Sequence, residues 1–386
     1  MERINQRNQW ALLPIWIVLI LPFLSVYALR NFIDPKAYQA WQIFAMLLSG
    51  TLVVYSAREI LVDLYSGLFV AFQLELLLAT TLRWGLSFGI VTMVLSMTFL
   101  FLLLQTSFYE QMLRALAVLI VVLVLLNLPG LLLRPDSGDE LYFIGGKNSF
   151  GIVLIPGAFL ILLHALERSG KPRRSTYVWL ALCLLTVLLG ASGTGMVVTV
   201  VATVATALAA KFKPPKWVCL TVIVIFYIVF IFFAEDFIQT RFWEWLTDLL
   251  GKDSTLTSRT AIWKTVKLYV GKYWLFGVGR GVRIPYINVD GLYRVNYESH
   301  NFVLEILLEG GFLALLLYGS LLFYTIRHLN MNDLKQRMVF VALCVLLVNG
   351  LTESTLNSCF VTLMLGIACR YAAENRRNLK PNEHKV

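Results

Sequence analysis

Apolar residues fill the chain in long separate runs that short polar segments interrupt. Many of these runs extend over roughly 17–25 residues, the length that an α-helix needs to cross the hydrocarbon core of a bilayer. A transmembrane barrel would instead show polar and apolar residues in alternation. The pattern predicts an all-α polytopic membrane protein. We expect about 12 transmembrane helices, near residues 10–28, 38–56, 61–81, 84–105, 113–133, 148–166, 176–191, 194–210, 216–233, 302–325, 337–353 and 357–373.

One connection between these runs is long and charged, unlike the others. It contains two stretches with a helical pattern, "FIQTRFWEWLTDLL" and "SRTAIWKTVKLYV". In the second, Ile262, Val266 and Val270 form one apolar stripe, as expected for a helix that rests on a bilayer surface. The sequence thus divides into nine transmembrane helices (1–233), an extracytoplasmic loop with short helices (234–301), three further transmembrane helices (302–373) and a cytoplasmic tail (374–386).

The positive charges predict the orientation of the chain, because cytoplasmic connections are enriched in Lys and Arg. With both termini in the cytoplasm, the basic connections "RSGKPRRS" and "KFKPPK" lie inside. The short outer connections hold only Arg30, Lys36, Arg83, Arg134 and Lys147. The long loop carries nine Lys and Arg residues on the outer side, which long loops can do without reversing the topology.

Composition supports this class and excludes others. The chain is 58% hydrophobic and 15% charged, with a mean hydropathy of +0.73, whereas soluble domains are about 45–50% apolar. The five cysteines lie in or beside apolar runs without metal-ligand spacing, so we expect neither disulfides nor zinc. The net charge of +10 follows from the connections and does not indicate nucleic acid. The first run, 10–28, is long for a signal peptide and lacks a small-residue cleavage site, so we expect a spanning helix there.

Histidine chemistry is expected at one place on the outer face. Only His300, in "YESHNFVLEILLEGG", is predicted to lie there among the four histidines of the chain. A histidine can accept a proton near neutral pH, although a lone histidine at a helix start is also an ordinary interfacial residue.

Arginines in the same loop are suited to binding phosphate. The candidates are Arg259, Arg280 and Arg283, since guanidinium groups match phosphate oxygens and stay charged. Gly277 and Gly279, in "GVGRG", would let backbone amides approach an anion. The alternatives are contacts with lipid headgroups and a simple flexible turn.

A base beside a phosphate clamp is suited to attack by a hydroxyl on a sugar whose leaving group is a lipid diphosphate. His300 would remove the hydroxyl proton as general base. Arg259 and Arg280 would stabilise the charge that grows on the diphosphate. No P-loop and no acidic cluster for a metal is evident, so we expect no cofactor.

The stretch from "SRTAIWKTVKLYVGKYWLFGVGRG" through "SHNFVLEILLEGGFLALLLY" resembles the bacterial O-antigen ligase and O-antigen polymerase superfamily. In that resemblance Arg259 matches the loop arginine, Gly277 and Gly279 match the glycine turn, and His300 matches the base. The resemblance implies metal-independent transfer of a glycan from an undecaprenyl diphosphate-linked oligosaccharide to a glycan or lipid-core acceptor. It also implies a multi-pass protein of the bacterial plasma membrane, with its active site on the extracytoplasmic side.

Three positions differ from the family pattern. Trp274 stands where members often have proline, and Ser192 is followed by Gly193 where many ligases carry Ser-Arg. Arg280, Arg283, Lys147 or Arg134 would substitute for that arginine. Lys147 and Asn148, in "GGKNSFG", lie where members have a Gly- and Asn-rich entrance to the site and would touch substrate; Ser192 is a further candidate for substrate binding. The polar residues Lys147, Asn148 and Ser192 are equally explained as helix caps.

The alternatives to a polymerase remain open. A ligase shares the chemistry and differs in the acceptor, and the missing Ser-Arg favours a polymerase. A transporter would commonly show internal repeats or polar helices near the midplane. Glu75, Glu305 and Glu309 are the acidic residues within spans, with Glu305 expected to face away from His300 and Glu309 to line the bundle. A scaffold subunit of a glycan-export complex would not need His300.

Overall fold

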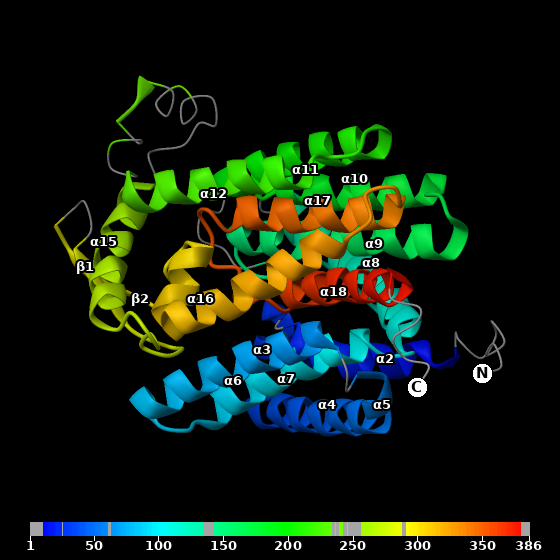
Figure 1. Ribbon diagram of the computed structural model, residues 1–386, viewed down its shortest axis with the longest axis horizontal. Helices are drawn as coiled ribbons and strands as arrows, with labels where there is room; N and C mark the ends of the chain where they lie inside the picture. Colours follow the sequence, from blue (N-terminus) through cyan, green and yellow to red (C-terminus); the bar gives the residue numbers. More distant parts are fainter. Residues whose placement is uncertain are drawn as a thin grey trace.

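The computed structural model describes residues 11–24, 26–60, 63–133, 142–233, 236, 239–241, 245, 256–287 and 291–379, which form a bundle of helices with one small sheet (Figure 1). The first half contains α2 (Leu13–Ile20), η1 (Leu21–Phe23), α3 (Tyr27–Phe32), α4 (Pro35–Tyr55), α5 (Ala57–Ile60), α6 (Leu64–Trp84), α7 (Phe88–Leu104), α8 (Tyr109–Leu133), α9 (Lys147–Ser169) and α10 (Arg174–Leu189). The second half contains α11 (Gly193–Lys211), α12 (Lys216–Phe232), α15 (Leu256–Lys272), β1 (Ile284–Ile287), β2 (Tyr293–Asn296), α16 (Phe302–His328), α17 (Leu334–Asn349) and α18 (Cys359–Leu379).

A helix overlaps each of the twelve predicted spans. In the part of the chain that the structure describes, six helices are long and apolar enough to cross a membrane: α4, α6, α8, α9, α11 and α16. Four shorter segments are also apolar: α2 with η1, α7, α10 and α12. The helical architecture of a membrane protein is thus supported, and the count of twelve crossings stays a prediction. Polar caps such as Asp34, Asp63 and Asp333 fix where several helices begin, because their side chains accept hydrogen bonds from first-turn amides.

The long loop differs in two ways from the prediction. It contains an antiparallel hairpin, in which Ile284 pairs with Asn296 and Ile287 with Tyr293, and which the apolar pattern does not reveal. Helix α15 covers the second predicted short helix, but Ile262 and Val266 of its stripe are buried against the bundle. The stripe therefore packs on protein, and the expectation of a helix resting on lipid is wrong for it. The first predicted short helix, at 237–250, lies mostly outside the described residues.

Helix α15 and the hairpin lie at the opposite end of the bundle from the start of α2 and the end of α18 (Figure 1). Figure 1 shows α15 and the hairpin at the left, whereas α2 begins and α18 ends at the right. Two hydrophobic clusters fill the interior, one centred on α8, α9, α17 and α18 and the other on α6, α15 and α16. Large apolar side chains such as Val54 and Phe226 point outward, as expected for surfaces that face lipid.

Helix α16 is interrupted near its start, at Gly311. The φ of 65° and ψ of −160° at this residue are outside the helical region. The segment after α15 supplies hydrogen bonds on one side of the break. There the Val278 amide donates to the Leu308 carbonyl (2.7 Å), and the Gly279 amide donates to the Glu309 carbonyl (2.9 Å).

On the other side of the break, the direction of the hydrogen bonds is reversed. The carbonyls of Trp274 and Leu275 accept from the amides of Phe312 (2.7 Å) and Leu313 (3.2 Å). A broken helix is tolerated in a bundle when neighbouring protein satisfies the freed backbone groups in this way. These four hydrogen bonds hold residues 274–279 of the long loop against α16, the helix that follows His300.

Candidate functional site

The start of α16 fixes the position of His300. Asn301 caps the helix, since its side-chain oxygen accepts from the amides of Val303 (3.1 Å) and Leu304 (3.0 Å). Its side-chain nitrogen donates to the carbonyl of Leu351 (3.0 Å), which joins the turn to the connection between α17 and α18. His300 itself has a φ of 54°, an uncommon left-handed conformation for a non-glycine residue. Such conformations persist only where surrounding contacts enforce them, and they gather at functional sites.

The contacts of His300 come from the connection between α17 and α18. Its amide donates to the Ser354 hydroxyl (2.9 Å), and its ring Nδ1 lies 3.7 Å from Glu353 Oε2. The His300 side chain is 24% exposed, whereas that of Glu353 is only 5% exposed. The ring is thus open to solvent on one side and faces a buried carboxylate on the other.

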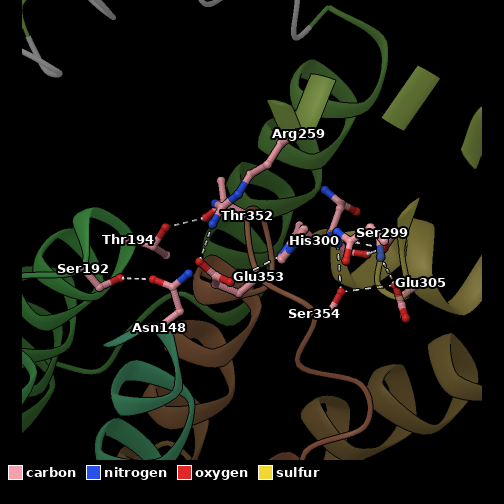
Figure 2. A network of polar contacts seen from close by, with 12 residues as sticks. Asn148, Ser192, Thr194, Arg259, Ser299, His300, Glu305, Thr352, Glu353 and Ser354 are labelled. Carbon is pink, nitrogen blue, oxygen red and sulfur yellow. Dashed lines mark hydrogen bonds and ion pairs between the residues drawn. The ribbon is translucent and has the colours of Figure 1, made fainter. Parts of the chain in front are cut away.

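Arg259 pairs with the same carboxylate. Its Nη2 donates to Glu353 Oε1 at 2.7 Å, so the carboxylate lies between the guanidinium and the imidazole (Figure 2). Trp263, one helical turn further along α15, donates from its indole to the Ser299 carbonyl (2.8 Å) and holds this face of α15 against the His300 turn. Burial alone would raise the pKa of Glu353, but the charges of His300 and Arg259, with the hydrogen bond from Arg259, outweigh it and lower the pKa below the ordinary value of 4.5.

A second carboxylate, that of Glu305, stabilises the turn before α16. Its Oε2 accepts from the Ser299 amide (2.6 Å) and from the Ser354 hydroxyl (3.2 Å), and the residue is buried. The expectation that Glu305 simply faces away from His300 is therefore wrong. One helical turn inside α16 brings its carboxylate back to the residue before His300, as in a capping arrangement.

Polar residues of α9 and α11 lie beside this site. Ser192 donates to the Asn148 side-chain oxygen (2.9 Å), and the hydroxyls of Thr194 and Thr352 lie 3.0 Å apart (Figure 2). Thr352 precedes Glu353, so these contacts connect the predicted entrance residues with the carboxylate that His300 and Arg259 face. Ser192 also caps α11, since its hydroxyl accepts from the Gly195 amide (3.3 Å).

Residues 178–319 match the family model described as O-antigen ligase. This segment of the chain is similar to that family. The matched segment begins within α10 and includes Arg259 and His300, so the resemblance seen in the sequence is confirmed. No curated protein matches the chain.

Glu353 lies outside the matched segment, and the sequence did not predict it as a site residue. The predicted span 337–353 included Glu353 in a transmembrane helix, whereas α17 ends at Asn349. The available signal was the polar run "TESTLNS" between two apolar stretches, expected at the same face as His300. Its spatial relation to Arg259 is visible only in the folded chain.

The glycine turn has a packing role that differs from the predicted contact with an anion. The amides of Gly277 and Gly279 already donate to the carbonyls of Tyr273 and Glu309. A Cβ on Gly277 would lie 2.6 Å from the Leu308 carbonyl oxygen, so the residue allows the backbone of the loop to touch α16.

Arg280 differs similarly from a free phosphate clamp. The residue is 4% exposed, and its Nε donates to Glu309 Oε2 at 3.0 Å. Glu309 is also buried, as expected for a residue that lines the bundle, and accepts from Asn357 (2.9 Å). The charge of Arg280 is therefore already balanced within the protein.

The remaining predicted cations occupy different settings. Arg283 is exposed on the turn before β1. Lys147 is half-buried at the start of α9, next to Asn148. Arg134 lies outside the described residues. Within the described part of the chain, no group of three or more His, Cys, Asp or Glu side chains is placed to hold a metal ion.

A cavity of about 250 Å³ lies beside Ser354. Its polar lining includes Ser354 itself, Glu298, Asn357 and Ser358, and apolar residues of η1 and α9 also line it. Ser354 therefore contacts both the backbone of His300 and the cavity. A compact polar group in this cavity would lie next to the His300 turn.

Proposed function

We propose that this protein transfers a glycan from a lipid diphosphate to a hydroxyl of an acceptor at the outer face of the plasma membrane. The observation that carries the proposal is the pairing of His300 and Arg259 with one buried carboxylate, Glu353. By resemblance to the family, the donor is an undecaprenyl diphosphate-linked oligosaccharide. His300 and Arg259 on either side of this carboxylate would supply the proton acceptor and the cation that this reaction requires.

His300 acts as the general base. With Nδ1 directed at Glu353, the Nε2 atom is left to accept the proton of the acceptor hydroxyl. The hydroxyl oxygen bonds to the anomeric carbon, and the bond between that carbon and the diphosphate oxygen breaks with its electron pair on the diphosphate. Glu353 stabilises the imidazolium that forms, as the third member of a nucleophile–base–carboxylate arrangement does.

Arg259 stabilises the departing diphosphate. Arginine carries five N–H donors, and Glu353 accepts one of them at 2.7 Å. The Arg259 side chain is 14% exposed at the site. The exposed Arg283 is available to assist at the end of the loop, whereas Arg280 is committed to Glu309 and positions α16.

The cavity beside Ser354 receives the acceptor sugar. Glu298 and Asn357 offer hydrogen-bond partners to sugar hydroxyls, and the apolar wall suits the non-polar face of a sugar ring. Among the described residues that line this cavity, Glu298 is the charged one. We infer that neutral or amino sugars are accepted here in preference to acidic ones.

Two acceptors remain in competition. The Ser192–Gly193 sequence favours a polymerase, which adds the glycan to another lipid-linked unit, whereas the description of the matching family model favours a ligase. The test is to reconstitute the purified protein with an undecaprenyl diphosphate-linked repeat unit, with and without a lipid A core acceptor. Products are then separated on a gel beside those of His300→Ala. His328→Gln, at the far end of the same helix, is the matched control.

A ladder from wild type and His328→Gln, absent in His300→Ala, would support a polymerase with His300 as base. A product that forms only with the lipid A core would support a ligase. Equal products from His300→Ala would refute the assigned base. A well-folded wild type that forms no product with either acceptor would favour a transporter or scaffold.

A further inference from the structure

A second cavity lies far from the His300 site, between α8, α9 and α10. Its volume is about 330 Å³, and it opens beside the turn between α9 and α10. Figure 1 shows this turn at the right, opposite α15 and the hairpin. His164, which lines the cavity, lies sixteen residues along α9 from Asn148, or about 24 Å at 1.5 Å per residue. The basic sequence "RSGKPRRS" makes this the end that we expect in the cytoplasm.

The mouth of the cavity is cationic. Arg168 of α9 and Arg173 at the start of α10 supply its charge, the imidazole of His164 lies beside them, and none of the described residues that line it is acidic. Arg114 of α8 is close enough to repel Arg168. Like charges that gather in one place are unfavourable unless an anion offsets them. Glu110 offsets part of the charge of Arg114.

The nearest acidic residue on α9 is directed elsewhere. Glu167 accepts from Lys335 Nζ of α17 at 2.9 Å and from the Tyr371 hydroxyl of α18. These contacts lie on the side of α9 that faces the core. The guanidinium of the adjacent Arg168 is therefore not neutralised by its neighbour in sequence.

Neutral donors complete a site for an anion. Ser175 and Thr176 of the first turn of α10 line the cavity, and first-turn amides carry the positive end of the helix dipole. Below this mouth the lining is apolar, with Val121, Ile161 and Trp179. A polar cationic mouth above an apolar base matches a lipid that has a phosphate headgroup and hydrocarbon chains.

We propose that this cavity binds a phosphate-bearing anion, held by Arg168 and Arg173 at the end of the bundle opposite the His300 site. An anionic phospholipid of the cytoplasmic leaflet supplies that chemistry together with acyl chains for the apolar base. Free phosphate supplies the same headgroup chemistry without the chains. The site is independent of glycan transfer, and its test does not depend on activity.

The experiment measures binding to the full-length protein by native mass spectrometry from detergent. The probes are phosphatidylglycerol, phosphatidylcholine as the lipid without net charge, and inorganic phosphate. The test variant is Arg168→Gln/Arg173→Gln. The matched control is Lys211→Gln/Lys213→Gln, which removes two exposed cations from the neighbouring turn between α11 and α12.

We expect the Arg168→Gln/Arg173→Gln variant to bind phosphatidylglycerol about thirtyfold more weakly, since each basic residue near a headgroup contributes about 1 kcal/mol. The control should remain within about twofold of wild type. Ala165→Trp fills the apolar part of the cavity and should block the lipid while leaving phosphate binding intact.

The source of the anion follows from the pattern of losses. Loss of phosphatidylglycerol binding in both Arg168→Gln/Arg173→Gln and Ala165→Trp supports a lipid headgroup. Loss of inorganic phosphate in the arginine variant alone, with no lipid preference, supports free phosphate. Equal binding of both probes by the arginine variant and its control would overturn the proposal, and so would a preference for phosphatidylcholine over phosphatidylglycerol.

Discussion

Replacing Glu353 by glutamine tests whether the buried carboxylate acts on His300. Glutamine keeps an oxygen that can accept from Arg259 Nη2 and removes only the negative charge. In the structure, Nδ1 of His300 lies 3.7 Å from the carboxylate, longer than a hydrogen bond. Catalytic hydrogen bonds are often long before substrate binds and shorten in the transition state. The charge of Glu353 is therefore expected to matter most when the imidazolium forms.

The magnitude follows from the strength of a charge-assisted hydrogen bond, about 1.5–3 kcal/mol. Since 1.36 kcal/mol is tenfold in rate, the substitution Glu353→Gln should lower kcat by about 10- to 150-fold. KM for the lipid-linked donor should change little, because the lost interaction develops only in the transition state. The loss of stability should stay below about 3 kcal/mol, the lower limit for breaking a buried pair outright.

The assay is glycan transfer by reconstituted protein at saturating donor, with thermal unfolding in detergent to show that the variant is folded. Glu374→Gln is the matched control, since Glu374 pairs with Arg370 at 3.1 Å and is 48% exposed at the far end of α18. Such a pair contributes less than about 1 kcal/mol, and the control should keep full activity. A folded Glu353→Gln variant with a kcat within about twofold of wild type would refute the assigned role of Glu353.

Three further outcomes are expected. The lowered pKa of Glu353 means that its ionised form stabilises the fold above the ordinary value of 4.5, and that this stabilisation is lost as the pH falls through the lowered pKa; unfolding temperatures below pH 4.5 should thus fall more steeply for wild type than for Glu353→Gln. Gly311→Ala should cost about 2–6 kcal/mol, because a Cβ there would lie 2.4 Å from the backbone of the loop at a positive φ, whereas Gly319→Ala in open space should cost nothing, as chemical denaturation can show. Arg280→Met should cost about 3–5 kcal/mol by leaving Glu309 buried without its cation, and adding Glu309→Gln should restore part of that loss; a double variant less stable than the single one would contradict this account.

The sequence by itself indicated where most helices lie, and it pointed to His300 and Arg259 as candidate site residues. Apolar runs specify helices through neighbours three and four residues apart, and caps such as Asn301 act over the same short range, so both can be read along the chain. The turn "GVGRG" and the His300 motif are also short contiguous stretches, so they can be recognised in the same way. Their resemblance to the O-antigen ligase family pointed to Arg259 and His300, which the structure brings to one carboxylate.

The tertiary structure alone decided which charges meet. Glu353 is separated by 53 residues from His300 and by 94 from Arg259, and no local pattern indicates such a pairing. It also decided that Arg280 is neutralised by Glu309 and that the glycine turn fills a break in α16. The sequence shows which groups can donate or accept a hydrogen bond. Their partners depend on which segments of the folded chain lie within hydrogen-bonding distance, and the packing of distant segments decides this.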